Sequence, residues 1–265
     1  MSNVVFWAFL ATLGTWSLTA FGSATVLFIK NPKKAILNLL LGFSAGVMIA
    51  ASFWSLLQPA IERAENDLTT PAYIIVTIGF IFGAVFIFLS DKAVTYTLEK
   101  TNTDIQNNSL KRVILLVLSI TIHNIPEGLA VGVAFGLLKN NQNNTTALMG
   151  AISIAIGIGL QNFPEGAAVS LPLKREGFSK GKSFFYGQAS ALVEPIAGVI
   201  GAVLVTTIKT ILPFALSFAA GAMILVSVHE LIPECQENKQ SQPYTATMGI
   251  IIGFAVMMLL DVMLG

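Results

Sequence analysis

A short motif rich in metal-binding side chains occurs twice in this chain. The first copy, HNIPEG, covers residues 123–128, and the second, QNFPEG, covers residues 161–166. Residues four apart share one face of a helix, so each copy can place two polar side chains together. An imidazole, carboxylates and amide oxygens in such proximity are typical ligands of a divalent transition metal. The paired side chains are His123 with Glu127, and Gln161 with Glu165.

A third carboxylate, Glu194, lies at the centre of another apolar stretch and is followed by Pro195. No lysine or arginine falls inside the apolar stretches. Because buried carboxylates are costly without a basic partner, they must be either protonated or neutralised by a cation. The mixture of nitrogen and oxygen ligands favours Zn²⁺ or Fe²⁺ over Ca²⁺ or Mg²⁺, which prefer oxygen alone. The sequence therefore predicts a buried site for a divalent transition metal.

The elements that must position these residues are long apolar segments. Only 11% of the 265 residues are charged, against about 25% in ordinary soluble domains, and 54% are hydrophobic. A helix needs roughly 20 apolar residues to cross a bilayer core, and eight segments meet or approach that length. We therefore predict an all-α integral membrane protein with a single transmembrane domain, residues 1–265. The segments are 4–29, 35–58, 72–90, 113–138, 147–173, 184–207, 211–233 and 246–264.

The two motif copies lie on consecutive and hence antiparallel helices. This arrangement indicates an inverted repeat, which secondary transporters use to build a site near the bilayer midplane. Pro126 and Pro164 lack an N–H, so the carbonyls of Ile122 and Leu160 lose their helical donors. Glycine at every fourth position of residues 128–136 predicts close packing against another helix.

Basic residues lie mainly in the loops on one side of the membrane. Counting alternate loops, twelve of the fifteen lysines and arginines fall on one side and three on the other. The positive-inside rule makes the richer side cytoplasmic and, with eight helices, places both termini outside. Short loops and the lack of a targeting peptide favour a bacterial plasma membrane. A net charge of +1 argues against a nucleic-acid partner, and the one cysteine, Cys235, excludes a thiolate cluster.

A second group of metal-binding residue types lies at the cytoplasmic end of the seventh segment: His229, Glu230 and Glu234. They form either a relay on the exit path of the metal or the charged end of an interfacial helix. Asp261, near the outer end of the eighth segment, is expected to contact solvent. The polar stretch 91–112 is expected to be a flexible connector.

The paired motifs resemble those of the ZIP (Zrt-, Irt-like protein) family of divalent metal transporters. The sequence GAAVSLPL at residues 166–173 is similar to the bacterial gufA-like branch of that family. The resemblance spans essentially the whole chain and implies a metal site, often binuclear, between helices two, four, five and six. Some members have Asp in place of Asn162 or His in place of Gln161, so the neutral pair here should bind a second cation more weakly. The implied ligands are His123, Glu127, Gln161, Glu165 and Glu194 at the primary site, Asn124 and Asn162 at a second site, and Met48 on helix two.

We therefore predict a transporter that moves Zn²⁺, or Fe²⁺, Mn²⁺ or Cd²⁺, into the cytoplasm by alternating access. The metal is then the transported substrate, one or two ions per site, and no cofactor is expected. Two alternatives use the same ligands: a selective metal channel, and an intramembrane metal-dependent hydrolase. The expected partners are the metal ions and the lipid bilayer, and a homodimer is left open.

Overall fold

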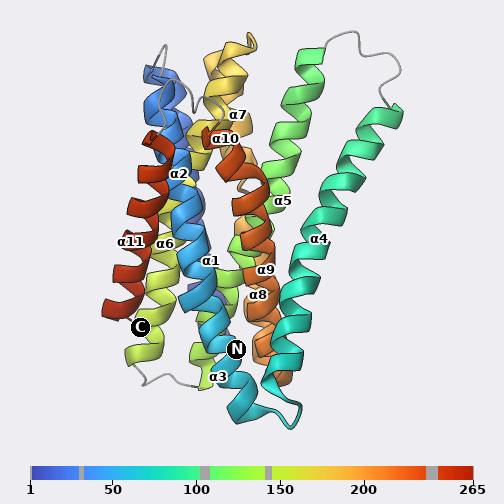
Figure 1. Ribbon diagram of the computed structural model, residues 1–265, viewed down its shortest axis with the longest axis vertical. Coiled ribbons are helices and arrows are strands. Elements are labelled where there is room, and N and C mark those ends of the chain that lie inside the picture. The colour runs from blue at the N-terminus through green and yellow to red at the C-terminus, as the bar shows by residue number, and fades with distance from the viewer. Residues whose placement is uncertain (1, 30–32, 102–107, 141–144, 237–243, 265) are drawn as a thin grey trace.

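The computed structural model describes residues 2–29, 33–101, 108–140, 145–236 and 244–264. Within these ranges every regular element is a helix (Figure 1). Eight helical segments of the described chain are long and apolar enough to cross a membrane, which confirms the predicted fold class. The elements are α1 (Ser2–Phe28), α2 (Lys34–Ala51), the π-helical turn η1 (Ser52–Leu57), α3 (Gln58–Asp67), α4 (Ala72–Thr101), α5 (Asn108–Gly136), the short 3₁₀ turn η2 (Leu137–Asn140), α6 (Thr145–Arg175), α7 (Lys180–Ala189), α8 (Val193–Thr207), the 3₁₀ turn η3 (Lys209–Ile211), α9 (Leu212–Val226), the π-helical turn η4 (Ser227–Leu231), α10 (Ile232–Gln236) and α11 (Thr245–Leu264).

Helices extend further beyond the membrane than hydropathy predicts. Most of the polar stretch 91–112 is helical, because α4 runs to Thr101 and α5 begins at Asn108. The expectation of a flexible connector is therefore wrong for these residues, and 102–107 lie outside the described chain. Hydropathy reports where a helix leaves the bilayer, and a helix can continue into water once nucleated.

The sixth span is broken near its middle. Helix α7 ends at Ala189 and α8 begins at Val193, with turns between them. Pro195 lies in the first turn of α8, where its missing N–H costs nothing. The carbonyl of Ala191 accepts a hydrogen bond from the backbone N–H of Glu194 at 3.0 Å. Glu194 thus lies at a helix N-terminus, which favours a negative side chain, and not at the centre of a continuous helix as predicted.

The helices form two groups. The first bundle contains α1, α5, α6, α7 and α8, and the second contains α2, α3, α4, α9, α10 and α11. The most extensive helix pairs are α1 with α6 and α5 with α8 in the first bundle, and α2 with α11 and α4 with α9 in the second. The bundles meet through smaller contacts of α2 and α11 with α6, and of α4 and α9 with α5.

Glycines make the contacts inside each bundle unusually close. A methyl group on Gly132 of α5 would lie 2.0 Å from the carbonyl oxygen of Gly198 on α8, which confirms the predicted close packing. On α4, a methyl group at Gly83 would lie 1.9 Å from the carbonyl oxygen of Phe218 on α9. Among the glycines that the structure describes, only Gly157 faces the other bundle, and it meets the flexible side chain of Met257. Backbone therefore packs against backbone within the bundles but not between them.

A second internal repeat relates α2 to α9. The sequence FSAGVMIAAS at residues 43–52 matches FAAGAMILVS at residues 218–227, and a π-helical turn begins at the final serine of each. The two serine hydroxyls donate equivalent hydrogen bonds, from Ser52 to the Met48 carbonyl at 2.7 Å and from Ser227 to the Met223 carbonyl at 2.9 Å. The inverted repeat of the metal motifs thus extends to the flanking helices.

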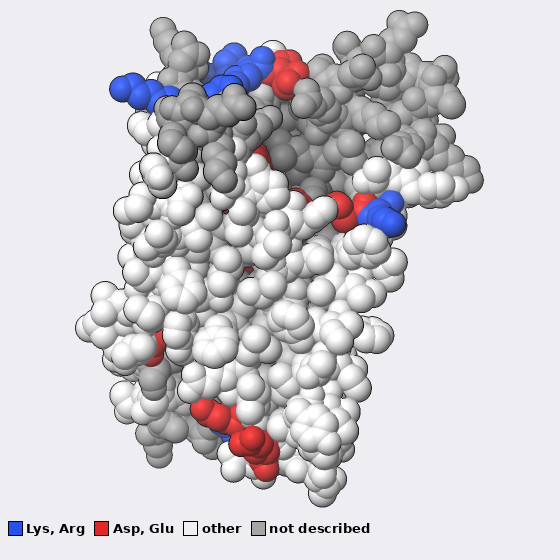
Figure 2. Space-filling view, viewed as in Figure 1, with Lys and Arg blue, Asp and Glu red and all other residues white. Residues whose placement is uncertain are grey.

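Charged residues are segregated along the long axis of the molecule. Figure 2 shows lysine and arginine mainly in the upper half and a group of acidic side chains at the lower end. Figure 1 places both ends of the chain towards the lower end. At the upper end α6 ends with Lys174 and Arg175 and α7 begins with Lys180.

Candidate metal centre

The predicted ligands come from four helices and are all buried. The first motif lies on α5 and the second on α6, while Glu194 begins α8. Met48 is fully buried on α2, where its carbonyl accepts a hydrogen bond from the Ser52 hydroxyl at 2.7 Å. Every candidate ligand except Met48 therefore belongs to the first bundle.

Glu127 and Gln161 join the two motif copies. The Gln161 Nε2 donates to Glu127 Oε1 at 2.7 Å, and both side chains are fully buried. Glu127 Oε2 and Gln161 Oε1 have no hydrogen-bond partner. A buried polar atom left unsatisfied costs about 1–3 kcal/mol, and more when it is charged. Two buried oxygens without donors, on side chains that contact each other, suit a cation as their missing partner.

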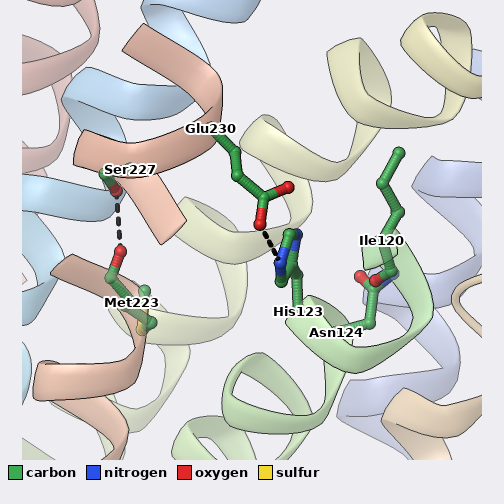
Figure 3. A network of polar contacts seen from close by, with 6 residues as sticks. All are labelled: Ile120, His123, Asn124, Met223, Ser227 and Glu230. Atoms are coloured by element: carbon green, nitrogen blue, oxygen red, sulfur yellow. Dashed lines mark hydrogen bonds and ion pairs between the residues drawn. The ribbon is translucent and has the colours of Figure 1, made fainter. Parts of the chain in front are cut away.

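Two further primary-site candidates, Glu165 and His123, contact the second bundle. The hydroxyl of Ser44 on α2 donates to Glu165 Oε1 at 2.5 Å. His123 Nε2 lies 2.7 Å from Glu230 Oε1, which projects from the π-helical turn η4 (Figure 3). The Ser44 hydroxyl also lies 3.2 Å from the backbone carbonyl of Gln161. Side chains that could bind metal thus form two of the polar contacts between the bundles.

The remaining primary-site candidate, Glu194, and the second-site candidates Asn124 and Asn162 are held by other protein groups. Asn162 Nδ2 donates to both carboxylate oxygens of Glu194, at 2.8 and 2.9 Å. The hydroxyl of Thr15 on α1 donates to Glu194 Oε2 at 2.5 Å. Asn124 is turned towards backbone, with its Nδ2 2.9 Å from the Ile120 carbonyl and 3.2 Å from that of Ser190. Neither oxygen of Glu194 is left without a donor.

No three His, Cys, Asp or Glu side chains in the described parts of the chain converge as a ready-made metal cluster. The carboxylates are instead spread among neutral donors: Gln161 for Glu127, Ser44 for Glu165, and Thr15 with Asn162 for Glu194. A metal ion would have to draw these side chains together by changing their rotamers.

A small cavity lies beside the two motif copies and the turn η4. It has a volume of about 30 Å³, which is enough for one water or ion, and Glu230 and Glu234 line it together with His123 and Glu165. His229 does not join them. It lines a separate apolar cavity of about 340 Å³ between α4 and α9, because successive residues of a helix point in different directions.

A larger cavity of about 610 Å³ opens at the acidic end, between the two bundles. Asp261 lines it and accepts hydrogen bonds from Ser55 at 2.7 Å and Ser153 at 3.1 Å. The expectation that Asp261 simply contacts solvent is therefore incomplete. Buried apolar residues, among them Val131 and Ile158, lie along α5 and α6 between this cavity and Glu127.

Sequence analysis missed the hydroxyl residues that hold the carboxylates. Ser44 and Thr15 lie in apolar helices outside the motifs, so nothing local marks them. On α1 a usable signal exists, because buried hydroxyls recur every three or four residues along one helix face. They are Thr12, Thr15, Thr19 and Ser23.

Comparison with known proteins agrees with this geometry. The sequence profile of the family "ZIP Zinc transporter" matches residues 4–112 and 101–261. The protein "Zinc transporter ZIP11" of Xenopus tropicalis is 39% identical, over 97% of this chain and 96% of its own length. The human protein of the same name is 38% identical over 98% of both chains. "Zinc transporter GufA" of Myxococcus xanthus is 30% identical, over 96% of this chain and 98% of its own. The chain therefore belongs to the ZIP family of zinc transporters.

Proposed function

We propose that this protein transports Zn²⁺ across the membrane into the cytoplasm and binds it between the two motif copies. The ligands are His123, Glu127, Gln161 and Glu165. The strongest support is the pair of buried oxygens on Glu127 and Gln161, which have no donor although the two residues bond each other at 2.7 Å. Met48, which is buried on α2, is a further ligand candidate from the second bundle.

The arrangement of the helices favours a carrier over a channel. All four ligands belong to the first bundle. Its helices pack closely at glycines, where no room is left for a larger side chain. Between the bundles the contacts are smaller and involve side chains. The first bundle can therefore move as a unit against the second and carry the metal with it. The hydrolase alternative is not supported, because the family consists of transporters.

The direction of transport rests on the charge distribution. The basic end of the molecule faces the cytoplasm by the positive-inside rule, and the small cavity beside His123 is lined by Glu230 and Glu234 near the end of η4 and in α10. Both termini are then outside. Assignment to a bacterial plasma membrane and to the gufA-like branch stays a prediction, as does transport of Fe²⁺, Mn²⁺ or Cd²⁺.

Uptake of radioactive zinc into proteoliposomes tests this function. We expect initial rates that saturate with zinc concentration and depend steeply on temperature, since each cycle requires a conformational change. Linear and fast flux would favour the channel alternative, and no flux above empty liposomes would refute transport. Competition by Fe²⁺, Mn²⁺, Cd²⁺, Co²⁺ and Ni²⁺ in the same assay ranks the metals.

The proposed exit path of the metal predicts different effects for substitutions at two neighbouring residues, Glu230 and His229. Glu230→Gln is expected to lower the maximal rate of zinc uptake roughly tenfold, the lower range for losing a group that supports a metal ligand. Glu230 contacts His123 and lines the small cavity, so it is placed to accept the departing ion. His229→Ala is the matched control, because His229 lines the other cavity. Equal effects of the two substitutions on initial rates would contradict this exit path.

A further inference from the structure

We propose that one acyl chain of an anionic phospholipid lies in the groove between α4 and α9, with the phosphate of that lipid beside Lys92. This α4–α9 groove is the apolar cavity of about 340 Å³ that His229 lines. Both helices belong to the second bundle and to membrane spans, Ala72–Tyr96 and Leu212–Gln236. Such a site belongs to the membrane-facing surface and does not depend on metal binding.

Helices α4 and α9 touch near the middle of their spans and diverge towards the basic end. A methyl group on Gly221 of α9 would lie 1.9 Å from the carbonyl oxygen of Phe80 on α4, and Gly83 makes an equally close approach to α9. Small residues of this kind let helix backbones meet in a membrane. Further towards the basic end, neither 84–101 nor 222–236 contains a glycine. Larger side chains therefore keep the helices apart, and Figure 1 shows α4 leaning away from α9 in its upper half.

The α4–α9 groove has the depth of one lipid leaflet. It extends from Phe80 and Gly221 to His229. The eight positions from Gly221 to His229 rise by about 12 Å at about 1.5 Å per residue, close to the half-thickness of about 15 Å of the hydrocarbon core. Among the described residues that line the groove only His229 is polar, and Val228 is 56% exposed. An apolar groove that opens on the surface of a membrane span at this depth meets acyl chains, so a lipid tail is its occupant.

Lys92 supplies a positive charge beyond the polar end of the groove. It lies on one row of every fourth residue of α4, which consists of Phe80, Ala84, Phe88 and Lys92. The Lys92 Nζ lies 4.6 Å from the centroid of the Phe88 ring, so the ammonium is held beside the apolar surface. Lys92 is exposed. Asp91 is not on this row, because successive residues of a helix point about 100° apart. The row therefore offers a cation to a phosphate whose acyl chain lies beside Ala84.

A second groove on the other side of Phe80 provides an internal comparison. This α3–α4 groove has a volume of about 550 Å³, and apolar residues such as Ile61 and Val76 make up most of its lining. Glu62 also lines it. A carboxylate repels a phosphate, whereas a lysine attracts it. The two grooves therefore differ in the headgroup that they accept, and only the α4–α9 groove suits an anionic lipid.

Native mass spectrometry of the full-length chain in detergent, titrated with phosphatidylglycerol or with phosphatidylcholine, tests the site. We expect the first phosphatidylglycerol to bind about fivefold more tightly than phosphatidylcholine, as one lysine near an anionic headgroup provides. Lys92→Gln should abolish this preference, and Lys92→Arg should retain it. Ala84→Trp places a large side chain in the α4–α9 groove and should weaken the binding of both lipids.

Two matched controls show whether the effects belong to this groove. Lys182→Gln removes a charge from an exposed position of α7 in the first bundle, and Thr77→Trp places a large side chain in the α3–α4 groove. Both variants should bind phosphatidylglycerol like the wild type. Equal affinity of the wild type for the two lipids, or equal effects of Lys92→Gln and Lys182→Gln, would overturn the proposal. A dimer of the chain that Ala84→Trp converts to a monomer would also overturn it, because a second copy would then occupy the groove.

Discussion

Glu127→Gln is expected to lower zinc uptake by about 100-fold or more, beyond what loss of a merely supporting group costs. The substitution keeps the size of the side chain but removes the negative charge. Glu127 is fully buried, and its Oε2 has no protein donor, so no other group can take its place beside the metal. Initial uptake rates in proteoliposomes, normalised to the amount of inserted protein, measure the effect.

The hydrogen bond between Glu127 and Gln161 allows a reciprocal control. In the double variant Glu127→Gln with Gln161→Glu, the carboxylate and the amide exchange places while their contact and the net charge are preserved. We expect this variant to recover part of the lost activity, which identifies the pair as one functional unit. Glu65→Gln, at an exposed position of helix α3, should transport normally. Normal uptake by Glu127→Gln alone would remove Glu127 from the site.

The second large effect concerns the packing within the first bundle. Gly132→Ala is expected to lower the free energy of unfolding by about 1–3 kcal/mol, the usual cost of overpacking. The added methyl group would lie 2.0 Å from the Gly198 carbonyl oxygen, so α5 and α8 must move apart. Thermal unfolding in detergent, followed by size-exclusion chromatography, measures the loss. Transport should fall as well, because α5 and α8 carry His123, Glu127 and Glu194.

Gly157→Ala is the informative comparison. Its methyl group would meet the sulfur of Met257, the end of a flexible side chain, across the boundary between the bundles. We expect a much smaller loss of stability than at Gly132. Gly14→Ala, where no atom lies within 4 Å of the added carbon, should be neutral. If Gly157→Ala destabilised the protein as strongly as Gly132→Ala, the bundles could not be treated as separate units.

The spans and the metal motifs could be predicted from the sequence because both depend on local patterns. Hydropathy over twenty residues marks a membrane helix, and the i, i+4 spacing of His123 and Glu127 places them on one helix face whatever surrounds them. The break before Glu194 was harder to predict. Pro195 permits a break but does not require one, and the turn at residues 190–192 depends on how α7 packs against α1 and α6.

Contacts between distant segments could not be predicted in this way. Thr15 and Glu194 are separated by 179 positions, and Ser44 and Glu165 by 121. Either hydroxyl alone looks like an ordinary small residue of a membrane helix. His229 and Glu230 line different cavities because neighbouring residues of a helix point in different directions, and which cavity each one meets depends on the packing of α9. The repeat shared by residues 43–52 and 218–227 is visible in the sequence and would have indicated that α2 and α9 are related.

The contacts of Glu165 with Ser44 and of His123 with Glu230 have a thermodynamic consequence. Both join the bundles through atoms that the metal needs, so an ion that captures these side chains weakens the boundary between the bundles. Linkage is reciprocal: whatever favours separation of the bundles must raise metal affinity by the same factor. Bilayer thickness and lateral pressure act on the relative position of such bundles. The lipid composition of the host membrane is therefore expected to set the zinc concentration at which this protein is half saturated.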